Sequence, residues 1–205
     1  MRALVVDDDL ATRALVAGLV RNQGFTVTTA ADGEEAWALF EKEPFPLVVT
    51  DWMMPRLTGV ELAAKIRGAL QPSAYSYVLV VTTLSAREHT LTAFEAGADD
   101  MLSKPVDAAQ IAARMGVAQR FLDAHAKRAE EAFASSLQAL QTELGHDHVA
   151  LAQNLASLSM LYRGRGAWAR ARAFVRREID VVVQAHGEDH PRVAQLRAEL
   201  ASLQG

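Results

Sequence analysis

Cysteine is absent from the 205-residue sequence. Disulfide bonds, zinc sites built from thiolates and thiol catalysis are therefore excluded, and the composition fits a reducing compartment. Long apolar runs are missing too, since no stretch approaches the length that spans a membrane. Met1–Val6 leads directly into an acidic cluster, which is unlike a signal peptide. We therefore expect a cytoplasmic protein that does not associate with membranes.

Neither sign of charge dominates, but the two signs are unevenly distributed. Residues 1–122 contain 11 basic and 15 acidic side chains, whereas residues 123–205 contain 10 of each. The second part has a run of arginines with no acidic residue between them: Arg163, Arg165, Arg170, Arg172, Arg176 and Arg177. This change in charge distribution along the sequence indicates two domains, which we place at residues 1–122 and 123–205.

Apolar runs and helical patterns alternate along the first 122 residues. The expected strands are Ala3–Val6, Thr26–Ala30, Leu47–Thr50, Val78–Thr82 and Met101–Leu102. The expected helices are Thr12–Asn22, Gly33–Lys42, Gly59–Leu70, Arg87–Ala96 and one that starts at Asp107. Five such units with continuous apolar strands predict an α/β domain with a parallel sheet covered on both faces.

Polar side chains follow four of these strands. They are Asp7–Asp9, Asp51, Thr82 and Lys104. Because the carboxyl ends of parallel strands meet at one edge of the sheet, we expect these groups to converge there. Several converging carboxylates repel one another unless a cation lies among them, and oxygen ligands without Cys or His favour Mg²⁺. A hydroxyl and an ammonium beside them suit a phosphoryl group.

These residues also resemble a known family. The motifs are Val5-Val6-Asp7-Asp8-Asp9, Asp51-Trp52-Met53-Met54-Pro55 with Gly59, Thr82-Thr83 and Lys104-Pro105. In this order they are similar to the receiver domain of two-component response regulators, over residues 1–122. The resemblance implies a flavodoxin-like fold with a five-stranded parallel sheet of order 2-1-3-4-5. It also implies a sensor histidine kinase or a histidine phosphotransfer protein as the phosphoryl donor.

The same resemblance assigns a phosphorylation site with Mg²⁺ as its cofactor. It implies that Asp51 accepts the phosphoryl group and that Asp8 and Asp51 ligate Mg²⁺ directly. The backbone carbonyl of Met53 would be a third ligand, and Asp7 would act through water. Asp9 is expected to cap a helix or to face solvent instead.

Further roles carry over to the last two strands. Thr82 and Lys104 are expected to hold the phosphoryl oxygens, and the Lys104–Pro105 bond is expected to be cis. Receivers usually place an aromatic switch residue where this sequence has Met101. Because methionine is flexible, we expect a weaker or different readout of the movement of Thr82.

Two apolar positions flank the expected path of the attacking water. They are Met53, two residues after Asp51, and Leu84, two residues after Thr82. Polar side chains at these positions help to orient water in the family, so we expect slow self-dephosphorylation here. Thr83 stands where receivers prefer a small residue and is expected to narrow phosphoryl access.

The remainder of the chain has a purely helical pattern. The helix that begins at Asp107 is expected to run on into the second domain, because no proline interrupts it before Leu144. Its apolar positions at intervals of four and three resemble a short coiled-coil seam: Ile111, Met115, Ala118 and Leu122.

An internal repeat with a displacement of 42 residues follows. Gly145-His146-Asp147-His148 recurs as Gly187-Glu188-Asp189-His190. The pattern resembles tetratricopeptide repeats of the kinesin-light-chain type, which are packing units that bind partner proteins. The resemblance implies helices at 126–143, 148–163, 168–186 and 190–204. Two positions depart from it: Glu178 replaces a small residue, and Arg197 replaces an apolar one.

The histidines and arginines of this part admit competing interpretations. His146, His148 and His190 favour capping of the repeat turns over a metal site or a phosphotransfer site. The arginines favour an acidic protein partner or contact with the acidic receiver over nucleic acid, because no helix-turn-helix signal is present. A homodimer is plausible because the repeat array is short.

Three functions are compatible with these features. The first is a phosphorylation-controlled response regulator that signals through protein interaction and is not an enzyme beyond phosphoryl acceptance and slow self-dephosphorylation. The second is a phosphorelay intermediate or phosphate sink whose helices only dimerise the chain. The third is a DNA-binding transcription regulator, which salt-sensitive DNA binding would support. Transfer from Asp51 to a histidine phosphotransfer protein would favour the second.

Overall fold

The computed structural model describes residues 1–69, 75–83 and 87–203. The chain divides into two compact units, Met1–Asp123 and Ala124–Gly205. None of the helices in these described ranges is long and apolar enough to cross a membrane. Each unit is described below by itself.

Strands and helices alternate through the first unit. They are β1 (Arg2–Val6), α1 (Leu10–Arg21), β2 (Thr26–Ala30), α2 (Gly33–Lys42), β3 (Leu47–Asp51), α3 (Gly59–Ala69), β4 (Tyr77–Thr82), α4 (Arg87–Glu95), β5 (Asp100–Ser103) and the start of α5 (Ala108–Leu144). All strand pairs are parallel, and their order is β2-β1-β3-β4-β5. The predicted flavodoxin-like fold is therefore confirmed.

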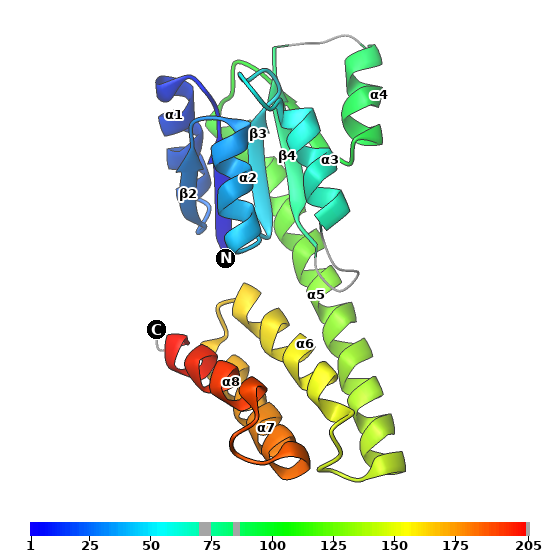
Figure 1. Ribbon diagram of the computed structural model, residues 1–205. Helices are drawn as coiled ribbons and strands as arrows, with labels where there is room; N and C mark the ends of the chain where they lie inside the picture. Colours follow the sequence, from blue (N-terminus) through cyan, green and yellow to red (C-terminus); the bar gives the residue numbers. More distant parts are fainter. Residues whose placement is uncertain (70–74, 84–86, 204–205) are drawn as a thin grey trace. The chain divides into compact units, whose positions relative to one another are not determined.

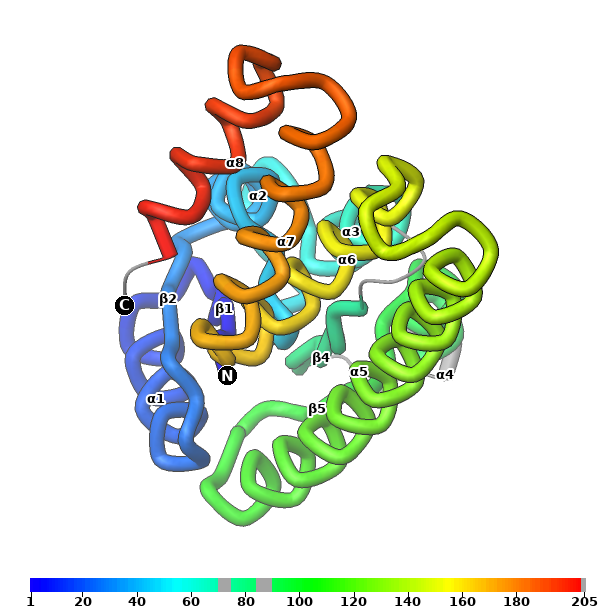
Figure 2. The backbone as a smooth tube through the Cα atoms, turned by 90° about the horizontal axis from the view of Figure 1, so that it is seen from below, coloured from blue at the N-terminus to red at the C-terminus, as the bar shows by residue number. Residues whose placement is uncertain are grey.

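Side chains from alternate strand positions enter two separate hydrophobic cores. Ala3 and Val5 of β1 face one core, whereas Leu4 and Val6 face the other. The first core also takes side chains from α1 and α5, and the second from α2 and α3. The sheet accordingly lies between two helical layers (Figures 1 and 2). Burial on both faces explains why the strands are continuously apolar.

The seam predicted along the last receiver helix has a different role. Ile111, Met115, Ala118 and Leu122 are buried, and all four belong to the core that α5 forms with α1 and the sheet. The coiled-coil interpretation is therefore wrong for these positions. The intervals of four and three describe one apolar face of a helix, and a sheet covers that face as well as a second helix does.

The second unit is helical. After the last part of α5 it contains α6 (Leu151–Gly164), α7 (Trp168–His186) and α8 (Pro191–Ser202). These helices share a core that includes Leu158, Val175 and Leu196, with Leu137 of α5 packed against it. The single helix α5 continues from the first unit into the second, as expected.

The 42-residue repeat reappears as repeated local geometry. Gly145 and Gly187 both have a φ of 87°, which a residue with a side chain rarely adopts. Three residues after each glycine, a histidine Nδ1 accepts a backbone hydrogen bond: His148 from Ala150 and His190 from Arg192. The two turns are thus built alike: His190 is the N-cap of α8, and His148 accepts the corresponding bond within the turn before α6.

The close approach of α3 to β3 generates a stability prediction. A Cβ added to Gly59 would lie 2.0 Å from the backbone oxygen of Asp51. We expect Gly59→Ala to lower the free energy of unfolding by about 2 kcal/mol or more, because backbone must move to admit the methyl group. Urea unfolding followed by circular dichroism measures this change.

Gly68 of the same helix is the matched control. A Cβ there has no neighbouring atom within 4 Å. Gly68→Ala is expected to leave stability unchanged or to raise it by up to about 1 kcal/mol, because alanine favours helices. Equal losses in the two variants would show that the close approach to Asp51 is unimportant.

Candidate functional site

Three carboxylates meet at the carboxyl edge of the sheet. Asp7 and Asp8 follow β1, and Asp51 ends β3. The strands β1 and β3 are paired so that Val6 lies opposite Thr50, which brings the two strand ends together. One carboxylate oxygen from each acid lies within 4.8 Å of the others. Asp7 and Asp51 are buried, whereas Asp8 is exposed to solvent.

A lysine bridges the two buried acids. The Nζ atom of Lys104 lies 2.9 Å from Asp51 Oδ1 and 3.0 Å from Asp7 Oδ2. The backbone N–H of Lys104 donates to the carbonyl of Thr82 at 2.7 Å, which attaches the segment after β5 to the end of β4. The Lys104–Pro105 peptide is cis.

Burial and charge act in opposite directions on these groups. Burial raises the pKa of Asp51, even though the hydrogen bond and the charge of Lys104 lower it. Burial also opposes the charge on Lys104, but the carboxylates of Asp51 and Asp7 together raise its pKa above the usual value. The site therefore contains more buried negative charge than the one lysine neutralises.

Asp9 lies beside the cluster but does not join it. Its carboxylate accepts hydrogen bonds from the backbone N–H and the hydroxyl of Thr12, both at 2.7 Å. These bonds cap α1 and lower the pKa of Asp9. The capping role agrees with the expectation from the sequence.

The segment between β3 and α3 is fastened to the sheet and to α2. The backbone N–H of Trp52 donates to Val81 at 2.8 Å, and the N–H of Gly59 donates to the carbonyl of Trp52 at 3.0 Å. Arg56 has a φ of 68° and forms ion pairs with Asp32 and Glu34 of the α2 amino terminus. Nothing in the sequence indicated that Arg56 would hold this segment.

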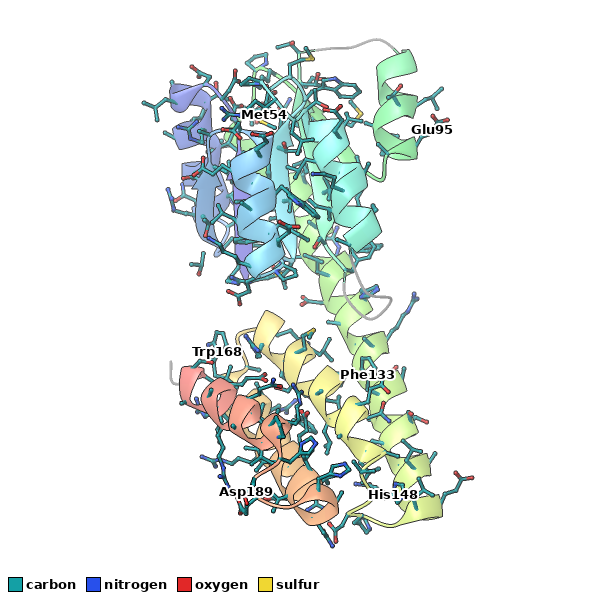
Figure 3. The ribbon with its side chains drawn as sticks, in the orientation of Figure 1. Met54, Glu95, Phe133, His148, Trp168 and Asp189 are labelled. Atoms are coloured by element: carbon teal, nitrogen blue, oxygen red, sulfur yellow. The ribbon has the colours of Figure 1, made fainter. Side chains whose placement is uncertain are left out.

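The methionines of this segment point in different directions. Met53 is 59% exposed, whereas Met54 is buried in the core under α2 and α3. Figure 3 labels Met54 at the edge of the sheet where the strands end. The sequence predicts that the Met53 side chain flanks the path of the attacking water. In the structure this side chain faces solvent.

Thr82 and Met101 lie on neighbouring strands at this edge. Thr82 follows Val81, which pairs with Asp51, and its side chain is buried. Met101 pairs with Val80 and is partly buried against the core shared with α2 and α3. Thr83 is exposed, and Leu84 lies outside the described residues.

The donor set suits a hard divalent cation. Three carboxylates offer oxygen ligands, no cysteine or histidine is among them, and one acid is open to solvent. Mg²⁺ prefers such oxygen donors and usually retains several water molecules, which an exposed Asp8 would accommodate. The residues present therefore fit Mg²⁺.

Most arginines of the predicted partner surface are paired with acids. Four of its six members form ion pairs within the second unit: Arg163 with Glu199, Arg165 and Arg170 with Glu130, and Arg177 with Asp147. The charges of these four arginines are largely neutralised by acids on other segments of the second unit. Arg172 and Arg176 have other surroundings, which are described below.

The raised pKa of Asp51 predicts a pH-dependent effect of Asp51→Asn. The folded protein keeps the Asp51 proton to a higher pH than the unfolded chain, so Asp51 lowers stability as the pH rises through its folded pKa. At about pH 7 we expect Asp51→Asn to unfold with a free energy about 1 kcal/mol higher than wild type. The difference should shrink as the pH falls through the raised pKa of Asp51 toward the ordinary value of 3.8, below which the carboxyl group is protonated in both states.

Urea unfolding at constant ionic strength and without divalent cations measures this difference. Lys104 keeps Asp7 as a partner in the variant, so the substitution leaves no unpaired lysine. An Asp51→Asn protein that is less stable than wild type at neutral pH would contradict the electrostatic account of the cluster.

Known proteins resemble the first unit. Response regulator RppA of Synechocystis is 33% identical over 124 residues, which cover 58% of this chain and 51% of RppA. Chemotaxis protein CheY-3 of Vibrio cholerae is 38% identical over 112 residues, which cover 54% of this chain and 85% of that protein. The chain thus spans about half the length of RppA but most of CheY-3.

Solved structures resemble the same region. Chemotaxis protein CheY4 of Vibrio cholerae is 31% identical with a TM-score of 0.52, covering 58% of this chain and 96% of that chain. The receiver domain of NtrX from Brucella abortus is 31% identical with a TM-score of 0.51, covering 59% of this chain and 98% of that chain. The response regulator receiver domain model matches residues 3–116, which is more than half of the sequence. Motifs, sheet order and matches agree, and the chain belongs to the response regulator receiver domain family.

Proposed function

We propose that the protein is a two-component response regulator that accepts a phosphoryl group on Asp51 and signals through its helical unit. The observation that supports this best is the cluster at the sheet edge. Asp7, Asp8 and Asp51 have oxygens within 4.8 Å of one another, and Lys104 contacts two of the three acids. Three neighbouring carboxylates with one lysine repel one another and so do not favour stability, but they suit the binding of a cation and a phosphoryl group.

In this proposal Asp51 is the nucleophile. One Oδ atom forms a bond to phosphorus while the bond between phosphorus and the donor breaks, and the donor leaves with that electron pair. The donor is the phosphohistidine of a sensor kinase or of a histidine phosphotransfer protein. The product is an aspartyl phosphate, and slow hydrolysis restores the carboxylate. The protein is thus reversibly modified as a switch and does not act as an enzyme on a separate substrate.

Asp8 and Asp51 would hold Mg²⁺ directly, the Met53 carbonyl would be a third ligand, and Asp7 would act through water. When bound, Mg²⁺ supplies positive charge for the oxygens of the transferring group. Arg56 fastens the β3–α3 segment that contains Met53 to the amino terminus of α2, which supports a fixed position for this backbone. Asp8 is exposed, so it can bind or release the cation without unfolding the core.

Lys104 and Thr82 would hold the phosphoryl oxygens. Lys104 Nζ is already beside Asp51, so it needs only a small movement to donate to a phosphoryl group on that side chain. A shift of Thr82 toward the phosphoryl group would leave room that Met101, on the adjacent strand, can fill. This coupling would shift a two-state equilibrium of the receiver.

The helical unit would be the output element. Its two equivalent turns, with glycine followed by a capping histidine, support a tetratricopeptide-like repeat. Repeats of this kind present surfaces for partner proteins. Phosphorylation would expose or hide such a surface or change self-association.

The absence of cysteine supports the reducing cytoplasm as the location of the protein.

Intact mass spectrometry after incubation with acetyl phosphate and Mg²⁺ tests the phosphoacceptor. We expect a phosphate-sized gain in wild type and none in Asp51→Asn, because only the carboxylate is a nucleophile. Sedimentation of the same samples reports any change in assembly. A gain of equal size in Asp51→Asn would assign the phosphoryl group to another residue.

The side chains beside the water path predict a change in the lifetime of the aspartyl phosphate. Met53→Asn combined with Leu84→Glu is expected to accelerate loss of the phosphoryl group by roughly tenfold, because polar side chains orient the attacking water. The decay of the phosphorylated mass with time after removal of acetyl phosphate measures this rate. Met54→Leu is a control because Met54 is buried away from solvent. An unchanged lifetime in the double variant would contradict the role of these two positions.

A further inference from the structure

Arg172 and Arg176 of α7 form no ion pair with an acid in the part of the chain that the structure describes. Arg176 is exposed, and within the described residues its guanidinium has no hydrogen bond or ion pair. Arg172 lies one turn earlier on α7 and donates from Nη1 to the backbone carbonyl of Leu203 at 2.8 Å. That carbonyl orients the guanidinium of Arg172 but does not neutralise it.

A third arginine joins them from the neighbouring helix. Helices α7 and α8 lie side by side (Figures 1 and 2), and Arg197 of α8 lines the same cleft as Arg172 and Arg176. Its ion pair is with Glu188, and the two side chains are 55% and 62% exposed. An exposed pair of this kind contributes little, so Arg197 can exchange Glu188 for another carboxylate at small cost.

The three arginines line a cleft together with two apolar residues. The cleft has a volume of about 270 Å³, and its remaining lining residues are Leu200 and Ala201. No acidic side chain is among the lining residues. The volume is below that of typical enclosed ligand pockets, so the cleft suits a few side chains of an extended segment better than a whole small molecule.

We propose that this cleft binds an acidic segment of a partner protein, with carboxylates of the partner on Arg172, Arg176 and Arg197. Guanidinium groups bind carboxylates with two parallel hydrogen bonds, and the apolar lining residues can contact the stem of a glutamate side chain. The inference rests on the proposed signalling role of the helical unit, for which it names the chemistry of the partner.

Charge around the cleft argues against nucleic acid. Residues 124–205 contain 10 basic and 9 acidic side chains, so the unit lacks the broad basic surface that follows a phosphate backbone. Glu188 forms an ion pair with Arg197 of the cleft, and Glu199 of α8 forms one with Arg163 of α6. Three arginines concentrated in one small cleft fit a short acidic segment.

Fluorescence anisotropy of a labelled oligoglutamate peptide tests the proposal on the full chain. We expect saturable binding by wild type that weakens between about 20 mM and about 150 mM salt, as screening increases. Arg176→Gln should weaken binding by roughly fivefold, and Arg172→Gln with Arg176→Gln by more. Melting curves confirm that each variant is folded.

Arg177→Gln is the matched control. Arg177 follows Arg176 on the same helix, but it pairs with Asp147 and the carbonyl of His146 and is not among the lining residues. Its substitution removes the same charge and should leave peptide affinity within about twofold of wild type. If Arg176→Gln and Arg177→Gln weakened peptide binding equally, the effect would be one of general charge, and the proposal that the cleft is the binding site would be wrong.

Two further outcomes would also overturn the proposal. One is an absence of peptide binding at low salt, and the other is tighter binding of a DNA duplex that Arg176→Gln abolishes. The Asp51→Asn protein separates this proposal from phosphorylation. It should bind the peptide as wild type does. Failure of the phosphorylation test would therefore not affect the peptide-binding result, and failure of peptide binding would not affect the phosphorylation result.

Discussion

Repulsion between buried carboxylates is the constraint on which the first unit depends. Asp7 and Asp51 lie at adjacent strand ends in an environment that favours neutral groups, and Lys104 Nζ contacts both within 3.0 Å. Burial still raises the pKa of Asp51 despite this lysine. The cluster therefore has an excess of negative charge that a divalent cation would relieve, and Asp8 faces solvent.

The neighbouring structure is arranged around this edge. Strand pairing brings β1, β3 and β4 to a common end, and the backbone bond from Lys104 to Thr82 brings the residue after β5 to the same place. Gly59 permits α3 to approach the carbonyl of Asp51, and Arg56 fastens the intervening segment to α2. Asp51 is thus held by backbone contacts and ion pairs on several sides. These contacts fix the position of its carboxylate, while Met53 remains exposed to solvent.

Much of the first unit follows from sequence because parallel sheets obey simple rules. Continuous apolar strands separated by helices predict the fold, and polar residues at strand ends predict a common site. The same reasoning could not anticipate Arg56, since a positive φ and a partner 24 residues away leave no local signal. It also misread Ile111 and Met115, because helical periodicity shows that a face is buried but not whether a sheet or a helix covers it. In the second unit, the run of arginines gave no sign that most would pair with distant acids such as Glu130 and Asp147.

Calorimetric titration with Mg²⁺ tests the account of the acid cluster most directly. The account predicts one saturable site in wild type, and a loss of affinity of about tenfold or more in Asp8→Asn, because an exposed ligand is removed without disturbing the core. Asp9→Asn is the control, since Asp9 caps α1 outside the cluster and asparagine caps equally well. It should bind Mg²⁺ as wild type does. An Asp8→Asn protein with wild-type affinity, or a wild type that does not bind Mg²⁺, would contradict the claim that these carboxylates form a cation-assisted phosphorylation site.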